Sequence, residues 1–249
     1  MNDMSVNSTS EHLRDAKRAP REAAGLAPIS RIEIVPLDPV VEPSLPMIMA
    51  HDPSDPRHEA MCALRTELLL RREFADRAEI IVLLSPCRGE GRSLLAAHLA
   101  IAVARTGCPT LLVDADFRHP RQHELFGTHR DQGLSEAIAA GERPRLRTVY
   151  GHPRLSLLTA GELAGDPLFC LSSLCFKLMV DDWRENFGFV VIDTAPVAQF
   201  SEGLVIADLV GRVLVLSRAQ HTPYRQMQDM LRRLTVTRSQ IQGAVLSHF

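Results

Sequence analysis

Residues 85–93 read Ser-Pro-Cys-Arg-Gly-Glu-Gly-Arg-Ser, between an apolar run at 80–84 and a helical pattern at 94–104. Strand, glycine-rich loop and helix, in that order, form the context of a phosphate-binding P-loop. Because Gly89 and Gly91 carry no Cβ, the backbone can curl there and turn successive amides toward phosphate oxygens. The first turn of the helix adds free amides and a positive dipole end. The sequence therefore predicts a phosphate site where this helix begins.

The loop departs from the P-loop pattern at two positions. Pro86 stands at the first glycine of the pattern, and Arg92 replaces the lysine that reaches the β- and γ-phosphates. Arginine keeps the charge, but it carries a planar fork rather than a compact ammonium. We therefore expect phosphate binding to persist and phosphoryl transfer to be impaired. The predicted ligand is ATP or ADP, and the predicted binding residues are Arg88, Gly89, Glu90, Gly91, Arg92, Ser93 and Leu94.

Two further hydrophobic stretches end in aspartate. Residues 111–113 lead into Asp114 and Asp116, and residues 189–192 lead into Asp193. P-loop folds use a strand that ends in Asp to hold Mg²⁺, or its water, beside the phosphates. Alternate strand residues share a face, so Asp114 and Asp116 could enter one site. The aspartates could instead only cap the turns that follow, but the order and spacing of the three motifs favour a Mg²⁺ site.

Composition limits the class of protein. The 249 residues carry a formal net charge of −2, which argues against a dedicated nucleic-acid binder. The five cysteines form no CxxC pair and no metal-ligand spacing, as expected for reduced thiols in the cytoplasm. No apolar run approaches the roughly 20 residues that span a bilayer. We expect a cytoplasmic protein that reaches the inner membrane only through a partner.

Strands and helices alternate along most of the chain. Residues 1–45 are polar and aperiodic, which predicts a disordered N-terminal arm. Residues 46–249 are predicted to form one α/β domain, a doubly wound, mostly parallel sheet with helices on both faces. Expected strands lie at 80–84, 110–113, 155–159, 189–192, 213–217 and 243–246. Expected helices lie at 59–74, 94–104, 167–183, 204–210 and 224–234, with helical and irregular sequence at 123–147.

Four signatures carry a specific resemblance: residues 59–68 (EAMCALRTEL), 89–93 (GEGRS), 112–120 (LVDADFRHP) and 191–197 (VIDTAPV). With them, residues 50–249 resemble the cytoplasmic domain of bacterial tyrosine autokinases of capsule and exopolysaccharide synthesis, within the wider group of septum-site and partition ATPases. The resemblance implies a P-loop fold with ATP and Mg²⁺ as cofactors. Its implied metal residues are Ser93, Asp114 and Asp193, and its implied catalytic residues are Asp116, Asp114 and Arg92, with Asp116 activating an acceptor hydroxyl.

Several positions differ from the family pattern. In the P-loop, Arg92 stands for the family's lysine and Arg88 for its usual proline. Cys62 replaces the central arginine of the helix motif. Glu202 replaces the aspartate beyond the Asp193 motif, and Ser247 replaces the asparagine expected beside adenine. No tyrosine-rich tail precedes Phe249, so we expect no phosphotyrosine cluster. These differences predict a degenerate member that binds nucleotide weakly.

The resemblance also implies a partner and an assembly. The expected partner is the cytoplasmic segment of a membrane polysaccharide co-polymerase, which the protein would assist in exopolysaccharide synthesis or export. The helix with Glu59 and Arg65 would support only weak self-association, because Cys62 cannot supply a charged fork. Two alternatives stay open: an active tyrosine kinase or ATPase of the same pathway, and a partition-type ATPase acting on DNA or membrane.

Overall fold

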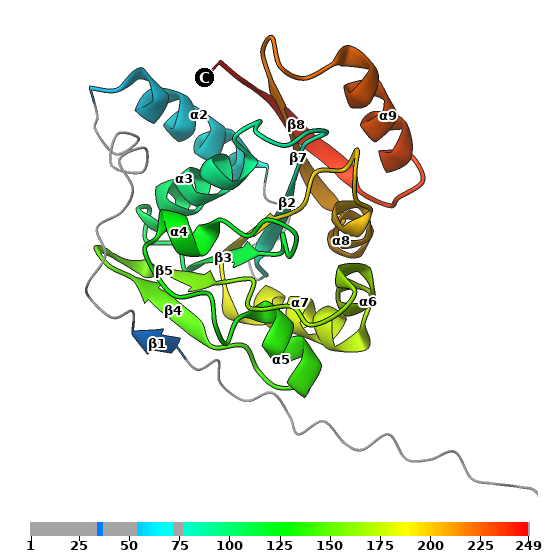
Figure 1. The fold of residues 1–249 in the computed structure, drawn as a ribbon. Helices are drawn as coiled ribbons and strands as arrows, with labels where there is room; N and C mark the ends of the chain where they lie inside the picture. The colour runs from blue at the N-terminus through cyan, green and yellow to red at the C-terminus, as the bar shows by residue number, and fades with distance from the viewer. Residues whose placement is uncertain (1–33, 37–53, 72–76, 249) are drawn as a thin grey trace, which may run out of the picture. The chain divides into compact units, whose positions relative to one another are not determined.

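The computed structural model describes residues 34–36, 54–71 and 77–248, all within one compact unit, residues 31–249. Its strands form a single sheet in the order β1-β4-β5-β3-β6-β2-β7-β8 (Figure 1). The strands are β1 (Ile34–Pro36), β2 (Glu79–Leu84), β3 (Thr110–Asp114), β4 (Leu146–Val149), β5 (His152–Leu158), β6 (Phe189–Asp193), β7 (Arg212–Arg218) and β8 (Gln240–Ser247). The β4–β5 pair is antiparallel, and the other pairs are parallel.

Helices cover both faces of this sheet, which confirms the predicted doubly wound architecture. On one face α2, α3 and α4 pack over the central strands, and on the other face α5 to α9 do so. The helices are α2 (Pro56–Leu70), α3 (Arg92–Ala104), α4 (Gln122–Leu125), α5 (Leu134–Ala140), α6 (Pro167–Leu171), α7 (Leu174–Asn186), α8 (Glu202–Val210) and α9 (Tyr224–Leu234). No described helix is both long and apolar enough to cross a bilayer.

The central strands are buried on both faces. In β2, Ile81 and Leu83 pack under α3, whereas Ile80, Val82 and Leu84 pack toward the α7–α8 face. A strand covered on both sides gains from an apolar residue at every position, which explains why β2, β3 and β6 appear in the sequence as continuous apolar runs. Helices on both faces therefore leave the ends of these strands as the place where loops can form a site.

Three segments differ from the sequence prediction. The helix expected at 167–183 is two helices, because the Ser173 hydroxyl accepts from the Phe176 amide at 3.2 Å and caps a new start. The short strand β4 begins at the end of the stretch expected to be helical or irregular and runs two residues beyond it, and β1 lies inside the arm expected to be disordered. The other residues of that arm, and positions 72–74 of the predicted helix, lie outside the described residues.

The strand register brings the three sequence motifs together. β6 lies between β2 and β3, and Asp193 pairs in register with Leu83 on one side and Asp114 on the other. The glycine-rich loop continues directly from β2. Parallel strands end at the same edge of a sheet, where open α/β sheets bind their ligands. The topology therefore places the loop and both aspartate motifs at one edge.

Candidate nucleotide-binding site

The backbone of the loop depends on its two glycines. Gly89 and Gly91 have φ values of 75° and 89°, in the left-handed region that other residues adopt only with strain. Gly91 is the N-cap of α3, and its carbonyl accepts the Leu95 amide at 2.8 Å. The predicted nest of amides at a helix start is therefore present in the geometry.

The segment after β7 holds this loop in place. The buried Glu90 carboxylate accepts from the Cys87 amide at 2.8 Å and from the Thr222 hydroxyl. The Arg218 guanidinium donates to the Gly89 carbonyl at 2.9 Å, and the His221 ring lies 3.0 Å from the Arg88 carbonyl. These contacts hold the loop against the end of β7 and the segment that follows it.

Arg92 does not extend from the loop as a free cation. Its guanidinium is buried, with 7% of the side chain exposed. It donates to Asp193 Oδ1 at 3.2 Å, to Ser85 Oγ at 2.8 Å and to Asp116 Oδ2 at 3.1 Å. All three nitrogens of the fork thus bind side chains of the protein, and two of these are carboxylates.

The three aspartates form a buried cluster around this guanidinium. Asp114 accepts the amides of Asp116, Arg121 and Gln122 at 3.0–3.1 Å. Asp116 Oδ1 accepts two amides of its own turn at 2.9 and 3.1 Å, and the Gln122 side-chain amide donates to Asp193 Oδ2 at 2.9 Å. Each of the six carboxylate oxygens of the cluster therefore already accepts at least one N–H group.

The electrostatics of the cluster reflect burial more than pairing. Burial raises the pKa of Asp114 well above its ordinary value, and the neighbouring Asp193 adds to this rise. Burial also raises the pKa of Asp193, while the Arg92 charge and hydrogen bonds from Ser93 and Gln122 oppose it. Carboxylates that are costly to ionise need a nearby cation. Arg92 is the cation that contacts Asp193 and Asp116, whereas Asp114 is stabilised by backbone amides.

A Mg²⁺ ion fits this donor set poorly. The predicted ligands Ser93, Asp114 and Asp193 do lie at one edge of the sheet. However, no cluster of three or more His, Cys, Asp or Glu among the described residues is arranged to hold a metal. Mg²⁺ demands near-ideal octahedral geometry, and direct coordination would have to use the second lone pairs of oxygens that already accept N–H groups.

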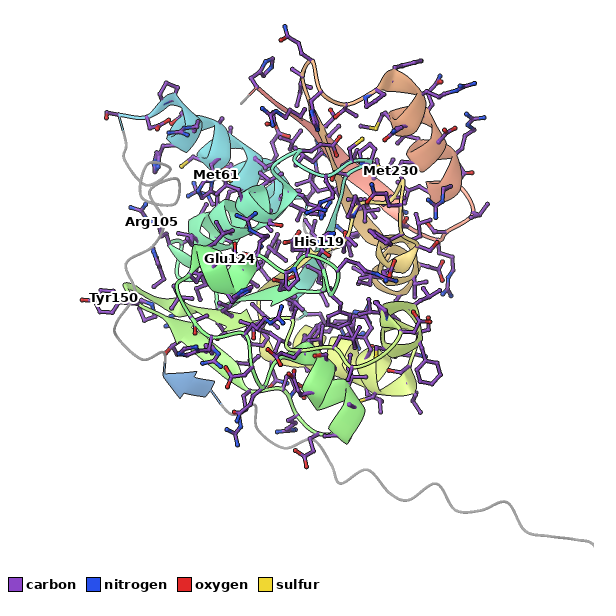
Figure 2. The ribbon with its side chains drawn as sticks, viewed as in Figure 1. Met61, Arg105, His119, Glu124, Tyr150 and Met230 are labelled. Atoms are coloured by element: carbon purple, nitrogen blue, oxygen red, sulfur yellow. The ribbon has the colours of Figure 1, made fainter. Side chains whose placement is uncertain are left out.

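Two cavities lie beside the start of α3. The first, of about 530 Å³, is lined by the loop together with Asp116, His119, Arg121 and Leu125. The second, of about 590 Å³, lies between α2, α3 and β8 and is mostly apolar. Gly91 and Leu94 line both cavities. Figure 2 shows one residue of each, His119 on the loop after β3 and Met61 on α2.

All the sequence-predicted site residues thus gather at this edge, and the loop residues 88–94 line the first cavity. Two contributors were missed. Gln122 bridges Asp193 and the Ser93 carbonyl, each at 2.9 Å, and Ser85 accepts from Arg92. Gln122 follows Asp114 by eight residues, and no motif marks it. Glu202 is buried and pairs with Arg118 at 2.9 Å, away from the Arg92 fork.

Comparison with known proteins gives the family context. The putative tyrosine-protein kinase EpsB of Ralstonia solanacearum is 29% identical over 197 residues, covering 78% of this chain and 26% of EpsB. The chimerical protein CapA2B2 has a solved structure with a TM-score of 0.76 and 26% identity, covering 84% of this chain and 92% of that one. This chain's homologues are bacterial tyrosine-protein kinases. No family model matches the chain.

The fold is also similar to that of solved kinase domains. The kinase domain of the Escherichia coli tyrosine kinase ETK has a TM-score of 0.76 at 22% identity, covering 87% of this chain and 89% of that one. P-loop ATPases share the fold more distantly. A cobyrinic acid a,c-diamide synthase from Mycobacterium smegmatis, with bound ADP and magnesium, has a TM-score of 0.56 at 18% identity, covering 68% and 74%. The chain spans about a quarter of the length of the first tyrosine kinases it matches.

The helix that carries the first signature, α2, packs against α3 (Figure 1). Cys62 Sγ lies 3.5 Å from the His58 ring, one turn earlier on the same helix. The Nε atom of Arg65 is buried and has no hydrogen-bond partner among the described residues. Cys62, at the predicted central arginine position, therefore contacts its own helix and carries no charge.

Proposed function

We propose that this chain is a degenerate, tyrosine-kinase-like nucleotide-binding protein that assists a membrane polysaccharide co-polymerase in exopolysaccharide synthesis or export. One observation carries the first half of the proposal: the guanidinium at the P-loop lysine position is bound by Asp116, Asp193 and Ser85. A cation held in this way is not available to follow a transferred phosphate. The pathway and the partner rest on the family resemblance.

The two neighbouring cavities favour a nucleotide as the ligand. The loop amides offer a site for phosphates, and the apolar cavity beside them offers a site for a base. The Ser247 hydroxyl lines that second cavity, is buried, and has no hydrogen-bond partner among the described residues. An orphaned buried hydroxyl costs free energy unless a ligand or water satisfies it, so Ser247 would meet a polar atom of the base.

Metal binding and catalysis should both be weakened in this site. Ser93, Asp114 and Asp193 remain the predicted Mg²⁺ residues, but the carboxylates already accept N–H donors. Asp116, the predicted base, holds Arg92 through one oxygen and two amides through the other. A general base needs an oxygen free to take the acceptor's proton. We therefore expect slow or absent phosphoryl transfer.

The position of Tyr150 supports the same expectation. Tyr150 lies in the β4–β5 turn, at the margin of the view in Figure 2, and is 77% exposed. β5 runs parallel to β3 and begins just after this turn, so Tyr150 lies at the opposite edge of the sheet from Asp116. We therefore expect that the site does not phosphorylate Tyr150 of its own molecule.

The partition-ATPase alternative has little support from the three arginines Arg232, Arg233 and Arg238 on α9 and in the turn after it. Arg232 pairs with Asp229, Arg238 pairs with Asp208 at 2.7 Å, and Arg233 donates to the Val197 carbonyl and the Ser201 hydroxyl. Arginines used in this way present little free charge to a phosphate backbone. The proposal therefore includes no nucleic-acid partner.

Two measurements test the proposal. Isothermal titration of the purified chain with ATP and ADP should give weak but saturable binding, and phosphopeptide mass spectrometry of the protein from its host should find no stoichiometric phosphotyrosine. Stoichiometric phosphate on Tyr150 or Tyr224 that disappears in Asp116→Ala would favour the active-kinase alternative instead. Failure to bind either nucleotide would refute the nucleotide-binding part.

A separate experiment tests the partner. Light scattering should give a monomer or weak dimer, and a fluorescent fusion should move to the inner membrane when the co-polymerase is expressed beside it. A stable large ring in isolation, or diffuse fluorescence whether or not the co-polymerase is present, would contradict this part of the proposal.

A further inference from the structure

We infer that the two arginines of the loop have separate roles. Arg92 takes the place of the metal ion as the fixed cation of the carboxylate cluster, and Arg88 takes the place of the P-loop lysine as the cation that contacts bound phosphate. Nucleotide binding would then need Arg88 and would not need Mg²⁺. This inference rests on the proposed nucleotide-binding function and names the residue that determines affinity at that site.

The first step is the charge balance of the cluster. Asp114, Asp116 and Asp193 are all buried, with 0–3% of each residue exposed. A metal ion would normally offset such a group of carboxylates beside phosphates. Here the Arg92 fork contacts two of the three, and backbone amides and Gln122 occupy the remaining oxygens. The chain thus supplies one positive charge and several N–H donors to the carboxylates that a metal ion would otherwise offset.

The second step is a comparison of the cations around the first cavity. Three arginines line it: Arg88, Arg92 and Arg121. Arg92 is bound to carboxylates, and Arg121 pairs with Glu124 at 2.7 Å. The Arg88 guanidinium is exposed, and within the described part of the chain no side chain or carbonyl pairs with it. Among the three arginines that line this cavity, Arg88 is therefore the one that no carboxylate binds.

The third step is the position of Arg88 on a rigid support. The Arg88 carbonyl lies 3.0 Å from the His221 ring, and the adjacent Gly89 carbonyl accepts from Arg218. The backbone is therefore held while the side chain stays unpaired. A guanidinium can bind two phosphate oxygens through parallel N–H donors. Arg88 can reach the cavity in this way at no cost in broken protein contacts.

The test is isothermal titration of the full chain with ADP, with ATP and with tripolyphosphate, each in Mg²⁺ and in EDTA. Arg88→Ala should weaken binding of all three roughly 10- to 100-fold, as expected for a lost charge-assisted hydrogen bond. Dissociation constants in Mg²⁺ and in EDTA should agree within about threefold, a difference in binding free energy smaller than RT ln 10. Arg154→Ala is the matched control, because it removes the same charge from an exposed position on β5 that lines neither cavity.

Each outcome decides one part of the inference. If Arg88→Ala binds as tightly as Arg154→Ala, Arg88 is not the phosphate contact. If EDTA abolishes binding by the unaltered chain, Arg92 has not replaced the metal. If the unaltered chain binds none of the ligands in either buffer, the proposed function fails and this inference fails with it. Circular dichroism of both variants checks that they fold like the parent.

Discussion

Replacing Arg92 by methionine tests whether the guanidinium holds the carboxylate cluster together. The substitution keeps much of the aliphatic stem and removes the hydrogen bonds to Ser85, Asp116 and Asp193. Removing one partner of a buried ion pair leaves an uncompensated buried charge and typically costs about 3–5 kcal/mol. In a domain of this size we expect the melting temperature to fall by roughly 6–20 °C.

The assay can use the chain's own fluorescence. Trp183 is the single tryptophan, it is buried, and it packs edge-on against Phe176 with ring centroids 5.9 Å apart. Its emission reports loss of the core during urea denaturation. The control is Arg232→Met, because Arg232 is 73% exposed and pairs with Asp229 on the surface of α9. Such a surface pair contributes about 1 kcal/mol or less.

A second variant separates lost charge from lost packing. Adding Asp193→Asn to Arg92→Met removes one of the stranded carboxylates, so the double variant should regain at least about 1 kcal/mol of the lost stability. A loss below about 1 kcal/mol in Arg92→Met would refute the reasoning, because it would mean that the carboxylates do not need this cation. No recovery in the double variant would assign the loss to packing alone.

Two further predictions concern other parts of the domain. Burial tends to raise the pKa of Glu136. Hydrogen bonds from backbone amides outweigh burial and hold this pKa below its ordinary value. Glu136→Gln should therefore cost about 1–2 kcal/mol near pH 7. Its difference from the parent in urea denaturation should shrink as the pH falls through the folded pKa, and a constant difference down to pH 3 would contradict this. Burial, with the charge of Glu90, raises the pKa of the Cys87 thiol to about 11, so alkylation mapped by mass spectrometry should be slow at pH 8 and complete after unfolding. Rapid labelling of Cys87 in the folded protein would show that its thiolate is not suppressed.

The sequence predicts the centre of this fold better than its margins. Strands β2, β3 and β6 are buried on both faces, so each residue contributes to the apolar signal. In contrast, β4 is short, half of its positions are only partly buried, and it pairs antiparallel with β5. The pairing of β1 with β4 is equally a tertiary contact. Neither strand has a local pattern from which it could be predicted.

In the candidate site, too, some features could be predicted from the sequence and others could not. The motif spacing predicts that Arg92, Asp116 and Asp193 meet, because parallel strands end at one edge. It does not predict the direction of the Arg92 side chain, which depends on carboxylates contributed by two other strands, 24 and 101 residues away in the chain. A side chain held by distant partners leaves no mark in the local sequence, and Gln122 was missed for the same reason.

Restoring the family's lysine at position 92, in the variant Arg92→Lys, therefore tests whether Arg92 replaces the metal ion. A lysine presents one ammonium, which cannot bond Ser85, Asp116 and Asp193 in the way the planar fork does. In Arg92→Lys we expect at least one aspartate to become available to a cation, so that Mg²⁺ strengthens ATP binding. The comparison that matters is the same variant in Mg²⁺ and in EDTA, measured by titration beside the parent. A gain in affinity that appears only with Mg²⁺ would mean that the guanidinium had been occupying the metal's place. An equal gain in both buffers would mean instead that arginine had merely crowded the phosphates, and the account of Arg92 as the resident cation would be wrong.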